Sequence, residues 1–315
     1  MKEWGGSPDS RRILGLIVTY NPDNDLLLRV LQRLLPQVDA VVVVDNGSAS
    51  SPDSVLRSVA DDRVRLIPLE RNLGLATAQN RGIQWAGDTG FSHIVFFDQD
   101  SLAEPGLVNA LMQGLQELEE SGVPVAAVGP VHIDPRSGAP SSFVRFPGFW
   151  PIREYCQSEE GAIETDFLLS SGTLIPVTSF SRIGLFEDDL FIDLVDTEWC
   201  FRARSRGYRL YGLCRARLHH LLGDDVTRIW FGRWRNVYHH KNPLRHYYTV
   251  RNHLVLYRRS YAPTHWVLMD IAQMAARILL FGFVLKPRFH YLGFIRQGFR
   301  DGLRKRLGPY PGSSA

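Results

Sequence analysis

The 315-residue sequence predicts an α/β fold, in which helices flank a mostly parallel sheet, followed by a helical and basic C-terminal extension. Over residues 13–131, short apolar runs alternate with helical patterns, which is typical of βαβ units. The apolar runs, such as Ile13–Tyr20 and Ala40–Asp45, are nearly continuous, as expected of strands buried on both faces. The hydrophobic fraction of 44% and the charged fraction of 22% are ordinary for a globular protein.

The elements follow in order along the chain. Pro36 ends the first helix, because proline cannot continue the hydrogen-bond ladder. Residues 132–163, rich in Pro, Gly and Ser, are expected to form a long functional loop or lid. Strands are expected at residues 13–20, 40–45, 64–69, 93–98, 123–131, 165–176, 190–194 and 209–214, and helices at residues 26–35, 75–86, 107–120 and 196–206.

The charge distribution separates the C-terminal quarter from the rest. Residues 226–315 carry 16 Lys and Arg against two acidic residues, whereas residues 1–225 carry 20 Lys and Arg against 31 Asp and Glu. A basic segment on an acidic body suggests an anionic partner, either nucleic acid or a membrane surface. We therefore expect a disordered tail at 1–12, a folded domain at 13–225 and a membrane-proximal extension at 226–315.

The apolar stretch Trp266–Leu285 is long enough to span a bilayer. Asp270, Gln273 and Arg277 interrupt it, and each charge at the bilayer centre costs roughly 2.5–3.5 kcal/mol. Their spacing places all three on one helical face. The stretch is therefore predicted to be an amphipathic helix that lies at a membrane interface or packs on the body.

The cysteines and the N-terminus favour the cytoplasm. Cys156, Cys200 and Cys214 form no CxxC pair, which favours a reducing compartment and buried structural thiols. Residues 1–12 have no apolar core of a signal peptide. We expect a cytoplasmic protein that is peripheral on the inner face of the cell membrane.

Polar side chains follow four successive strands, and such strand ends form the ligand-binding edge of an open parallel sheet. Asp98 and Asp100 together can hold Mg²⁺ or Mn²⁺ and leave coordination positions for diphosphate oxygens. A plainer explanation is helix capping by Ser101 and Glu104. The strand-end groups are Thr19–Pro22, Asp45–Ser48, Arg71–Gly74 and Asp98–Ser101.

A second carboxylate cluster, Asp193, Asp196 and Glu198, lies where a strand is expected to give way to a helix. One of these groups could act as a general base or could cap the helix, and the two roles are compatible. His219 and His220 follow a predicted strand, and a histidine there is either a metal ligand or a partly buried side chain.

As an ordered set, these motifs resemble family 2 glycosyltransferases of GT-A fold over about residues 13–255. The likeness to bacterial rhamnosyltransferases rests on narrower motifs, and Asp301–Leu303 also looks familial. Those motifs are Phe97–Ser101, Phe191–Asp193 and Arg245–Asn252.

The resemblance implies a nucleotide-binding half at 13–131 and an acceptor half at 132–225. Asp98 and Asp100 match the ribose and metal aspartates, and His220 matches a metal-side histidine, although His219 leaves that register open. Asp196 matches the catalytic base. Where many relatives carry a supporting Glu, this chain has Val195. The remaining implied residues are Thr19, Tyr20, Pro22, Asp45 and Asn72 around the nucleotide, and Asp193, Glu198 and Arg202 as support for the base.

The resemblance therefore implies a metal-dependent inverting glycosyltransferase. The favoured donor is dTDP-L-rhamnose, with a UDP-sugar as the alternative, and the acceptor is a lipid-linked or lipopolysaccharide glycan. A sugar-nucleotide pyrophosphorylase is disfavoured because no Gly-rich, basic phosphate loop follows the first strand. A nucleic-acid-binding protein would use the basic tail and stacking by Trp230, Trp234, Tyr247 and Tyr248.

Overall fold

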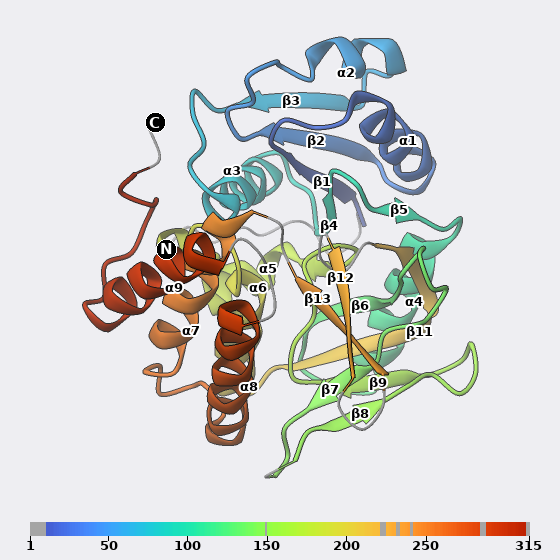
Figure 1. Ribbon diagram of the computed structural model, residues 1–315. Coiled ribbons are helices and arrows are strands. Elements are labelled where there is room, and N and C mark those ends of the chain that lie inside the picture. The colour runs from blue at the N-terminus through green and yellow to red at the C-terminus, as the bar shows by residue number, and fades with distance from the viewer. Residues whose placement is uncertain are drawn as a thin grey trace.

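The structure, a computed structural model, describes residues 11–148, 150–220, 225–230, 234–239, 242–283 and 288–312. Its centre is a curled sheet with helices on both faces (Figure 1). The strand order is β3-β2-β1-β4-β10-β6-β11-β5, and β9 also pairs with β11. This is the α/β architecture that the sequence predicts.

The first four strands are parallel and match their predicted positions within one residue. In the register, Val18 pairs with both Val44 and Asp98, so three strands end at the same level. This alignment brings their polar C-terminal residues to one edge of the sheet. The strands are β1 (Ile13–Thr19), β2 (Ala40–Asp45), β3 (Val64–Pro68) and β4 (His93–Asp98).

The other half of the sheet is mixed. β10 (Leu174–Pro176) is antiparallel to both of its neighbours, β4 and β6 (Val125–Ile133). β11 (Arg209–His219) runs parallel to β6 and antiparallel to β5 (Leu102–Ala103) and β9 (Ala162–Thr165). β11 extends five residues beyond the predicted strand end at Cys214, so it carries His220 to the edge beside Asp98.

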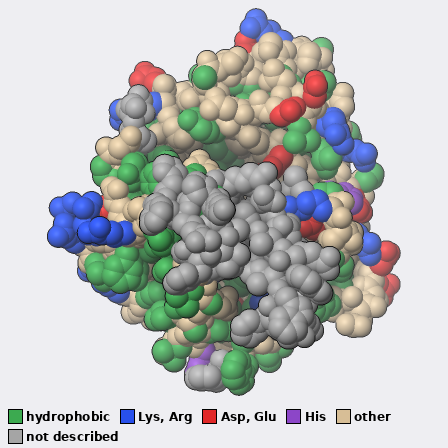
Figure 2. Space-filling view, in the orientation of Figure 1, with side chains coloured by type: hydrophobic (Ala, Val, Ile, Leu, Met, Phe, Trp, Pro, Cys, Tyr) green, Lys and Arg blue, Asp and Glu red, His purple; other side chains and the backbone are tan. Residues whose placement is uncertain are grey.

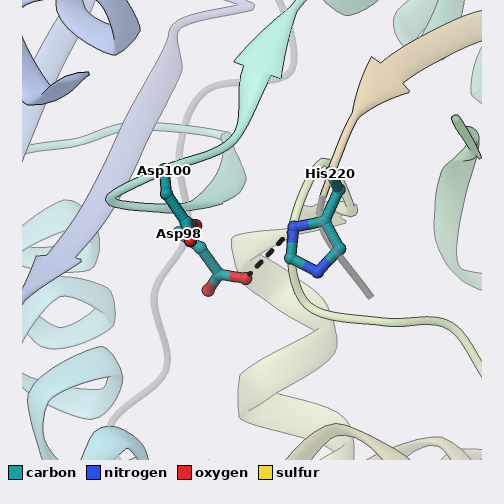
Figure 3. A group of neighbouring side chains, drawn as sticks. All are labelled: Asp98, Asp100 and His220. Atoms are coloured by element: carbon teal, nitrogen blue, oxygen red, sulfur yellow. Dashed lines mark ion pairs between the residues drawn. The ribbon is translucent and has the colours of Figure 1, made fainter. Parts of the chain in front are cut away.

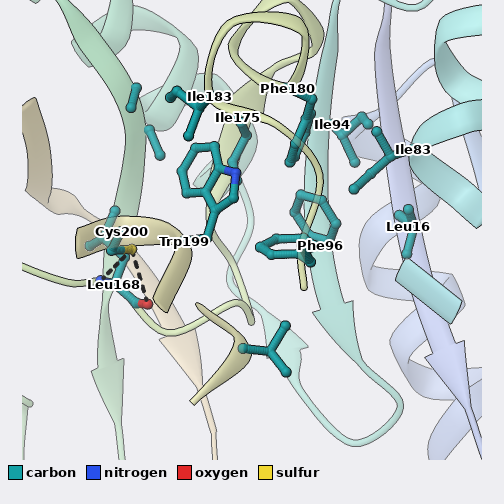
Figure 4. Close-up of a cluster of buried hydrophobic side chains, with 14 of the residues drawn as sticks. Leu16, Ile83, Ile94, Phe96, Leu168, Ile175, Phe180, Ile183, Trp199 and Cys200 are labelled. Atoms are coloured by element: carbon teal, nitrogen blue, oxygen red, sulfur yellow. Dashed lines mark hydrogen bonds between the residues drawn. The ribbon is translucent and has the colours of Figure 1, made fainter. Parts of the chain in front are cut away.

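Helices cover both faces of the sheet and bury alternate strand residues. On β1, Leu16 belongs to one apolar cluster and Ile17 to the other, which confirms strands buried on both faces. One cluster contains Trp199, whose ring packs at a tilt against Phe180, and Phe180 in turn meets Phe96 edge-on (Figure 4). The helices are α1 (Asn24–Leu34), α2 (Asp53–Val59), α3 (Leu75–Asp88), α4 (Leu107–Glu120), α5 (Val177–Ile183) and α6 (Val195–Ser205).

Two expectations along this part of the chain are corrected. The strand expected at 190–194 is wrong, because residues 188–190 form a 3₁₀ turn and Phe191, Asp193 and Leu194 have positive φ. The segment 132–163 is more than a loop, since it holds the paired strands β7 (Phe143–Arg145) and β8 (Ile152–Glu154).

Of the three cysteines expected to be buried free thiols, one is. Cys200 is a buried free thiol, as predicted. Cys156 and Cys214 form a disulfide that ties the 132–163 segment to β11, so the expectation of free thiols at these two positions is wrong. The two residues are 58 positions apart, and only the return of the chain along β11 brings them together.

The C-terminal part holds α7 (Pro243–Leu256), α8 (Thr264–Phe283) and α9 (Arg288–Leu303), and it is not wholly helical. Antiparallel strands β12 (Asp225–Trp230) and β13 (Trp234–His239) precede the helices. Residues 1–12 were expected to form a disordered tail, and residues 1–10 of it lie outside the described residues. No helix within the described ranges is both long and apolar enough to cross a bilayer.

The predicted polar stripe of α8 is divided by packing. Asp270 is buried against α7, where it accepts a hydrogen bond from Tyr257 and lies 3.2 Å from Nε2 of His253. Gln273 and Arg277 are exposed. Tyr247 and Tyr248 are 1% and 2% exposed, so these two rings cannot stack on nucleic-acid bases, while the side chains of Trp230 and Trp234 lie outside the described residues.

Candidate active site

A candidate metal site lies where β4 and β11 end. Asp98, Asp100 and His220 offer ligand atoms that all lie within 4.8 Å of one another. Figure 3 shows Asp98 at the end of β4 and Asp100 in the turn after it, with the imidazole of His220 across from them, and Asp98 Oδ2 lies 3.8 Å from His220 Nδ1. Two carboxylates and an imidazole could together hold a divalent metal ion.

Serine hydroxyls orient the metal-side histidine. Ser101 Oγ lies 2.8 Å from His220 Nδ1 and accepts a hydrogen bond from Ser171 Oγ at 2.8 Å. Ser171 Oγ also accepts from the backbone N–H of Asp98 at 3.2 Å. Outer hydrogen bonds of this kind fix the ring of a metal-ligating histidine. Sequence reasoning assigned no such role to Ser171, since its neighbours in the sequence give no signal.

The pair His219 and His220 is resolved by the strand alternation of β11. His219 Nε2 lies 2.9 Å from Glu104 Oε1, on the side away from the metal cluster. Glu104 and Ser101 therefore do not form a capping box, and α4 instead begins after Gly106. His220 is the histidine that joins Asp98 and Asp100.

Of the residues predicted to bind the nucleotide, some are buried below the cavity and others line its wall. Thr19 and Asp45 are buried, and Asp45 Oδ1 accepts from Thr19 Oγ1 at 2.9 Å and also from the Ser48 hydroxyl. Tyr20 and Asn72 line the cavity, whereas Pro22 is half-buried outside its lining.

Three side-chain amides tie the strand-end loops together. Gln99 Oε1 accepts from the N–H of Tyr20 at 2.8 Å, which joins the ends of β1 and β4. Asn72 Oδ1 accepts from Asn46 Nδ2 at 3.0 Å, and Asn46 Oδ1 accepts from the N–H of Leu73 at 2.9 Å. These bonds hold the loop between β3 and α3 against the end of β2.

Asp196 lies in the first turn of α6 and faces the same cavity. Its Oδ2 accepts from the backbone N–H of Ser170 at 3.1 Å, and its Oδ1 accepts from the N–H of Thr197 at 2.7 Å. Ser170 also lines the cavity, and its Oγ is buried without a hydrogen-bond partner among the described residues. Nothing in the sequence marks this serine.

Burial sets the protonation of the main groups. Desolvation raises the pKa of Asp196, against the hydrogen bonds from Thr197 and Ser170. Desolvation also raises the pKa of Asp98, with His220 opposing it and Asp100 and Asp196 adding to it. Burial lowers the pKa of His132, which packs against His220, to about 4, so His132 is neutral.

The two acidic neighbours of Asp196 are engaged elsewhere. Asp193 accepts hydrogen bonds from Arg245 and, at 3.0 Å, from Thr249 Oγ1. Glu198 is 1% exposed and pairs with Arg202, with Nε–Oε1 at 2.8 Å, and it also accepts from Tyr261 at 2.6 Å. Glu198 and Arg202 of α6 thus form a buried ion pair, and neither residue lines the cavity.

These groups surround one cavity of about 820 Å³. Its wall carries the metal-type cluster, Tyr20 and Asn72 at the sheet edge, and Asp193 and Asp196 at the start of α6. A divalent cation beside strand ends can neutralise a diphosphate, and a carboxylate across the cavity can accept a proton from a hydroxyl. An α/β sheet with this site is consistent with a glycosyltransferase.

Comparison with known proteins agrees with this class. Residues 16–160 match the model of the family described as Glycosyl transferase family 2. The chain is 31% identical over 300 residues to dTDP-rhamnosyl transferase RfbF of Shigella flexneri, covering 94% of this chain and 97% of that protein. The chain belongs to glycosyl transferase family 2.

Other relatives are more distant. An N-acetylglucosaminyl-diphospho-decaprenol L-rhamnosyltransferase of Mycobacterium tuberculosis is 26% identical, covering 64% of this chain and 74% of that protein. The structure of S. aureus TarS 1–349 has a TM-score of 0.52 at 16% identity, and the match covers 94% of this chain and 82% of that one. The structure of GalNAc-T7 with UDP, GalNAc and Mn²⁺ has a TM-score of 0.55 at 14% identity, and the match covers 67% of this chain and 43% of that one. The two solved structures show the shared fold.

Proposed function

We propose that the protein transfers L-rhamnose from dTDP-L-rhamnose, with a divalent metal and with inversion, to a hydroxyl of a lipid-linked or cell-surface glycan. The observation that carries this proposal is the meeting of a metal-type cluster and the carboxylate of Asp196 across one cavity. The choice of sugar rests on the likeness to a dTDP-rhamnosyl transferase over nearly the whole chain.

At the donor end, Asp98, Asp100 and His220 would hold Mn²⁺ or Mg²⁺. The metal, when bound, neutralises the charge that develops on the departing nucleotide diphosphate. Asp45 and Thr19 support the floor of the nucleotide pocket, and Tyr20 and Asn72 supply its wall.

Asp196 takes the proton from the acceptor hydroxyl. The N–H of Ser170 holds its Oδ2, and the raised pKa of Asp196 makes it a better base than an exposed aspartate. Asp193 is held by Arg245 and Thr249, and Glu198 is held by Arg202, so neither is placed as a nucleophile. A single base favours direct displacement and inversion.

Calorimetric titration tests the donor site. We expect dTDP to bind more tightly with Mn²⁺ or Mg²⁺ than with EDTA, and Asp100→Ala to abolish that difference. Asp45→Ala should weaken binding while the metal dependence remains, and the exposed Asp62→Ala should change neither. UDP binding tighter than dTDP would favour the UDP-sugar alternative. Nucleotide affinity that EDTA leaves unchanged would reject the metal site.

We also propose that the C-terminal helices attach the protein to the inner face of an anionic membrane. Figure 2 shows Lys and Arg side chains gathered at the left edge of the molecule, over the end of α9. An outward apolar stripe on α8 consists of Leu268, Ile271 and Leu279, which are 52%, 48% and 59% exposed. Each basic residue near an anionic surface contributes about 1 kcal/mol.

Liposome flotation tests the attachment. Binding should require anionic lipid and weaken at high salt, because the basic contribution is screened. Leu279→Ser should reduce the binding that remains at high salt, since that part depends on the apolar stripe. Equal flotation with neutral vesicles, or none with either, would exclude the electrostatic attachment.

A further inference from the structure

The cavity has two chemically different ends. The end at the sheet edge is lined by carboxylates, His220 and polar side chains. The other end lies between the C-terminal helices. There α7 contributes Val250 beside the polar side chains of Arg245, His246, Thr249 and His253, α8 contributes Met274, Arg277 and Ile278, and α9 contributes Ile295. We call Val250, Met274, Arg277, Ile278 and Ile295 the helical end of the cavity. A volume of about 820 Å³ is near the top of the usual range for ligand sites, roughly 300–1,000 Å³.

The helical end is coupled to the base by direct contacts. Asp193, three residues before Asp196, accepts hydrogen bonds from Arg245 and Thr249 of α7. Val250 follows Thr249 and packs with Ile295, Met274 and Ile278 in one apolar cluster. A ligand at the helical end therefore lies on the α7 side of Asp196, whereas the metal cluster lies on the β4 side.

The lining of the helical end suits an amphiphile. A bare saccharide would leave hydroxyls unpaired against Val250, Ile278 and Ile295, at a cost of about 1–3 kcal/mol for each buried group. A chain of CH₂ and CH₃ groups gains about 0.8 kcal/mol for each CH₂ that it buries.

Arg277 is the exposed cation of this end. Asp270, the acidic residue of α8, is buried and bonded to Tyr257 and His253, and Arg277 interacts with its charge from a greater distance. Arg277 lies about two turns further along the helix and lines the cavity. An exposed guanidinium at the rim of an apolar wall matches a phosphate or diphosphate attached to an apolar chain.

α8 continues from the cavity to the outside. Met274, Arg277 and Ile278 face the cavity, and the outward apolar stripe of Leu268, Ile271 and Leu279 lies on the neighbouring face. A long apolar chain that leaves the cavity beside Ile278 therefore meets an apolar surface instead of water.

We infer that the helical end binds the lipid-diphosphate portion of the acceptor, with Arg277 contacting the diphosphate and with Ile278, Met274 and Ile295 contacting the first apolar units. This inference rests on the proposed function, because it places the acceptor sugar between the helical end and Asp196. It adds the chemical class of the acceptor: a sugar joined through a diphosphate to an apolar chain.

Binding of geranylgeranyl diphosphate, below its aggregation concentration, tests the inference without any transfer of sugar. The protein is first saturated with dTDP and Mn²⁺, which fills the nucleotide site, and the probe is titrated by calorimetry. We expect Arg277→Gln to weaken probe binding about tenfold, equivalent to about 1.4 kcal/mol. Ile278→Asn should weaken it at least as much.

Matched controls come from the same helices. Arg296→Gln removes an exposed arginine of α9, and Ala276→Asn places the same polar group on a face of α8 away from both the cavity and the apolar stripe; both should leave the affinity within twofold. In the wild type, geranylgeraniol should bind more weakly than geranylgeranyl diphosphate. In Arg277→Gln the alcohol and the diphosphate should bind with equal affinity. Thermal unfolding and dTDP affinity should match the wild type in all four variants.

The outcomes are distinct. Probe binding that Asp100→Ala removes and Arg277→Gln retains would place the probe diphosphate in the nucleotide site and overturn the inference. Absence of probe binding under dTDP saturation, or equal effects of Ile278→Asn and Ala276→Asn, would also overturn it. If dTDP fails to bind with metal while the probe still depends on Arg277 and Ile278, the proposed donor chemistry fails and the lipid-diphosphate site stands.

Discussion

Asn252 donates its side-chain amide to the backbone carbonyl of Asp193 at 2.8 Å. The same amide group donates to the carbonyls of Ile192 at 2.8 Å and Leu190 at 3.0 Å. Asn252 is fully buried on α7, so one side chain of the C-terminal part holds the loop that precedes Asp196. Within that loop, left-handed residues cost about 1–3 kcal/mol each and persist only when their surroundings fix them.

Asn252→Ala should release this loop. We expect a loss of about 1–3 kcal/mol in the free energy of unfolding, because the buried carbonyls lose their donor. Transfer should fall about 10-fold or more at nearly unchanged dTDP affinity, since the base is displaced while the donor site is not. Asn252→Asp should be worse than alanine, because a carboxylate would face the carbonyls. Urea unfolding and steady-state kinetics measure these effects, and normal turnover in both variants would contradict a positioning role.

Asp196→Asn should separate donor binding from turnover. The amide keeps the size of the side chain but cannot take a proton, so transfer should fall by at least about 10²-fold with normal dTDP affinity. Asp193→Asn should be milder. Close to normal transfer by Asp196→Asn, with an inactive Asp193→Asn, would show that the base is misassigned.

The pH dependence of the wild type follows from the raised pKa of Asp196. The base is lost as pH falls through this pKa, so the acidic limb of kcat/KM should lie above the ordinary value of 3.8. A folded state with the higher pKa binds the proton more tightly, so the charged form destabilises the protein above that pKa. Asp196→Asn should therefore be more stable than the wild type at neutral pH, as thermal unfolding at several pH values would show.

Glu198→Gln should damage stability more than catalysis. It leaves Arg202 buried without its carboxylate, and breaking such a pair costs about 3–5 kcal/mol. Glu117→Gln is the matched control, because its partner Arg215 lies in an exposed pair worth about 0–1 kcal/mol. Donor affinity should remain normal in both. Glu198→Gln with wild-type stability and no transfer would assign Glu198 to the reaction.

The denatured protein should present one reactive thiol before reduction and three after it, because Cys156 and Cys214 are joined and Cys200 is free. Reduction should lower the free energy of unfolding by up to about 4 kcal/mol for a loop of this length. Thiol titration in guanidinium and urea unfolding with and without a reductant measure both quantities. Three thiols before reduction would exclude the disulfide.

The first half of the sheet and the donor edge were predictable from local sequence. Apolar runs such as Ala40–Asp45 report burial on both faces, and their register alone brings Thr19, Asp45 and Asp98 to one level. Residues 190–194 misled the prediction because a short apolar run does not distinguish a strand from an irregular loop. The φ values there are imposed by distant partners, including Asn252 and the Cβ-free Gly74.

By itself, the sequence determined the α/β class, the positions of the first four strands and the presence of Asp98 and Asp100 at a strand end, because periodicity and strand ends are local properties. Tertiary structure decided which histidine joins the aspartates, that Glu198 is engaged by Arg202, and that α7 supports the loop before the base. It also decided that Cys156 meets Cys214. Each of these depends on contacts between residues far apart in the chain, whose energies come from burial and hydrogen bonding that no local pattern encodes.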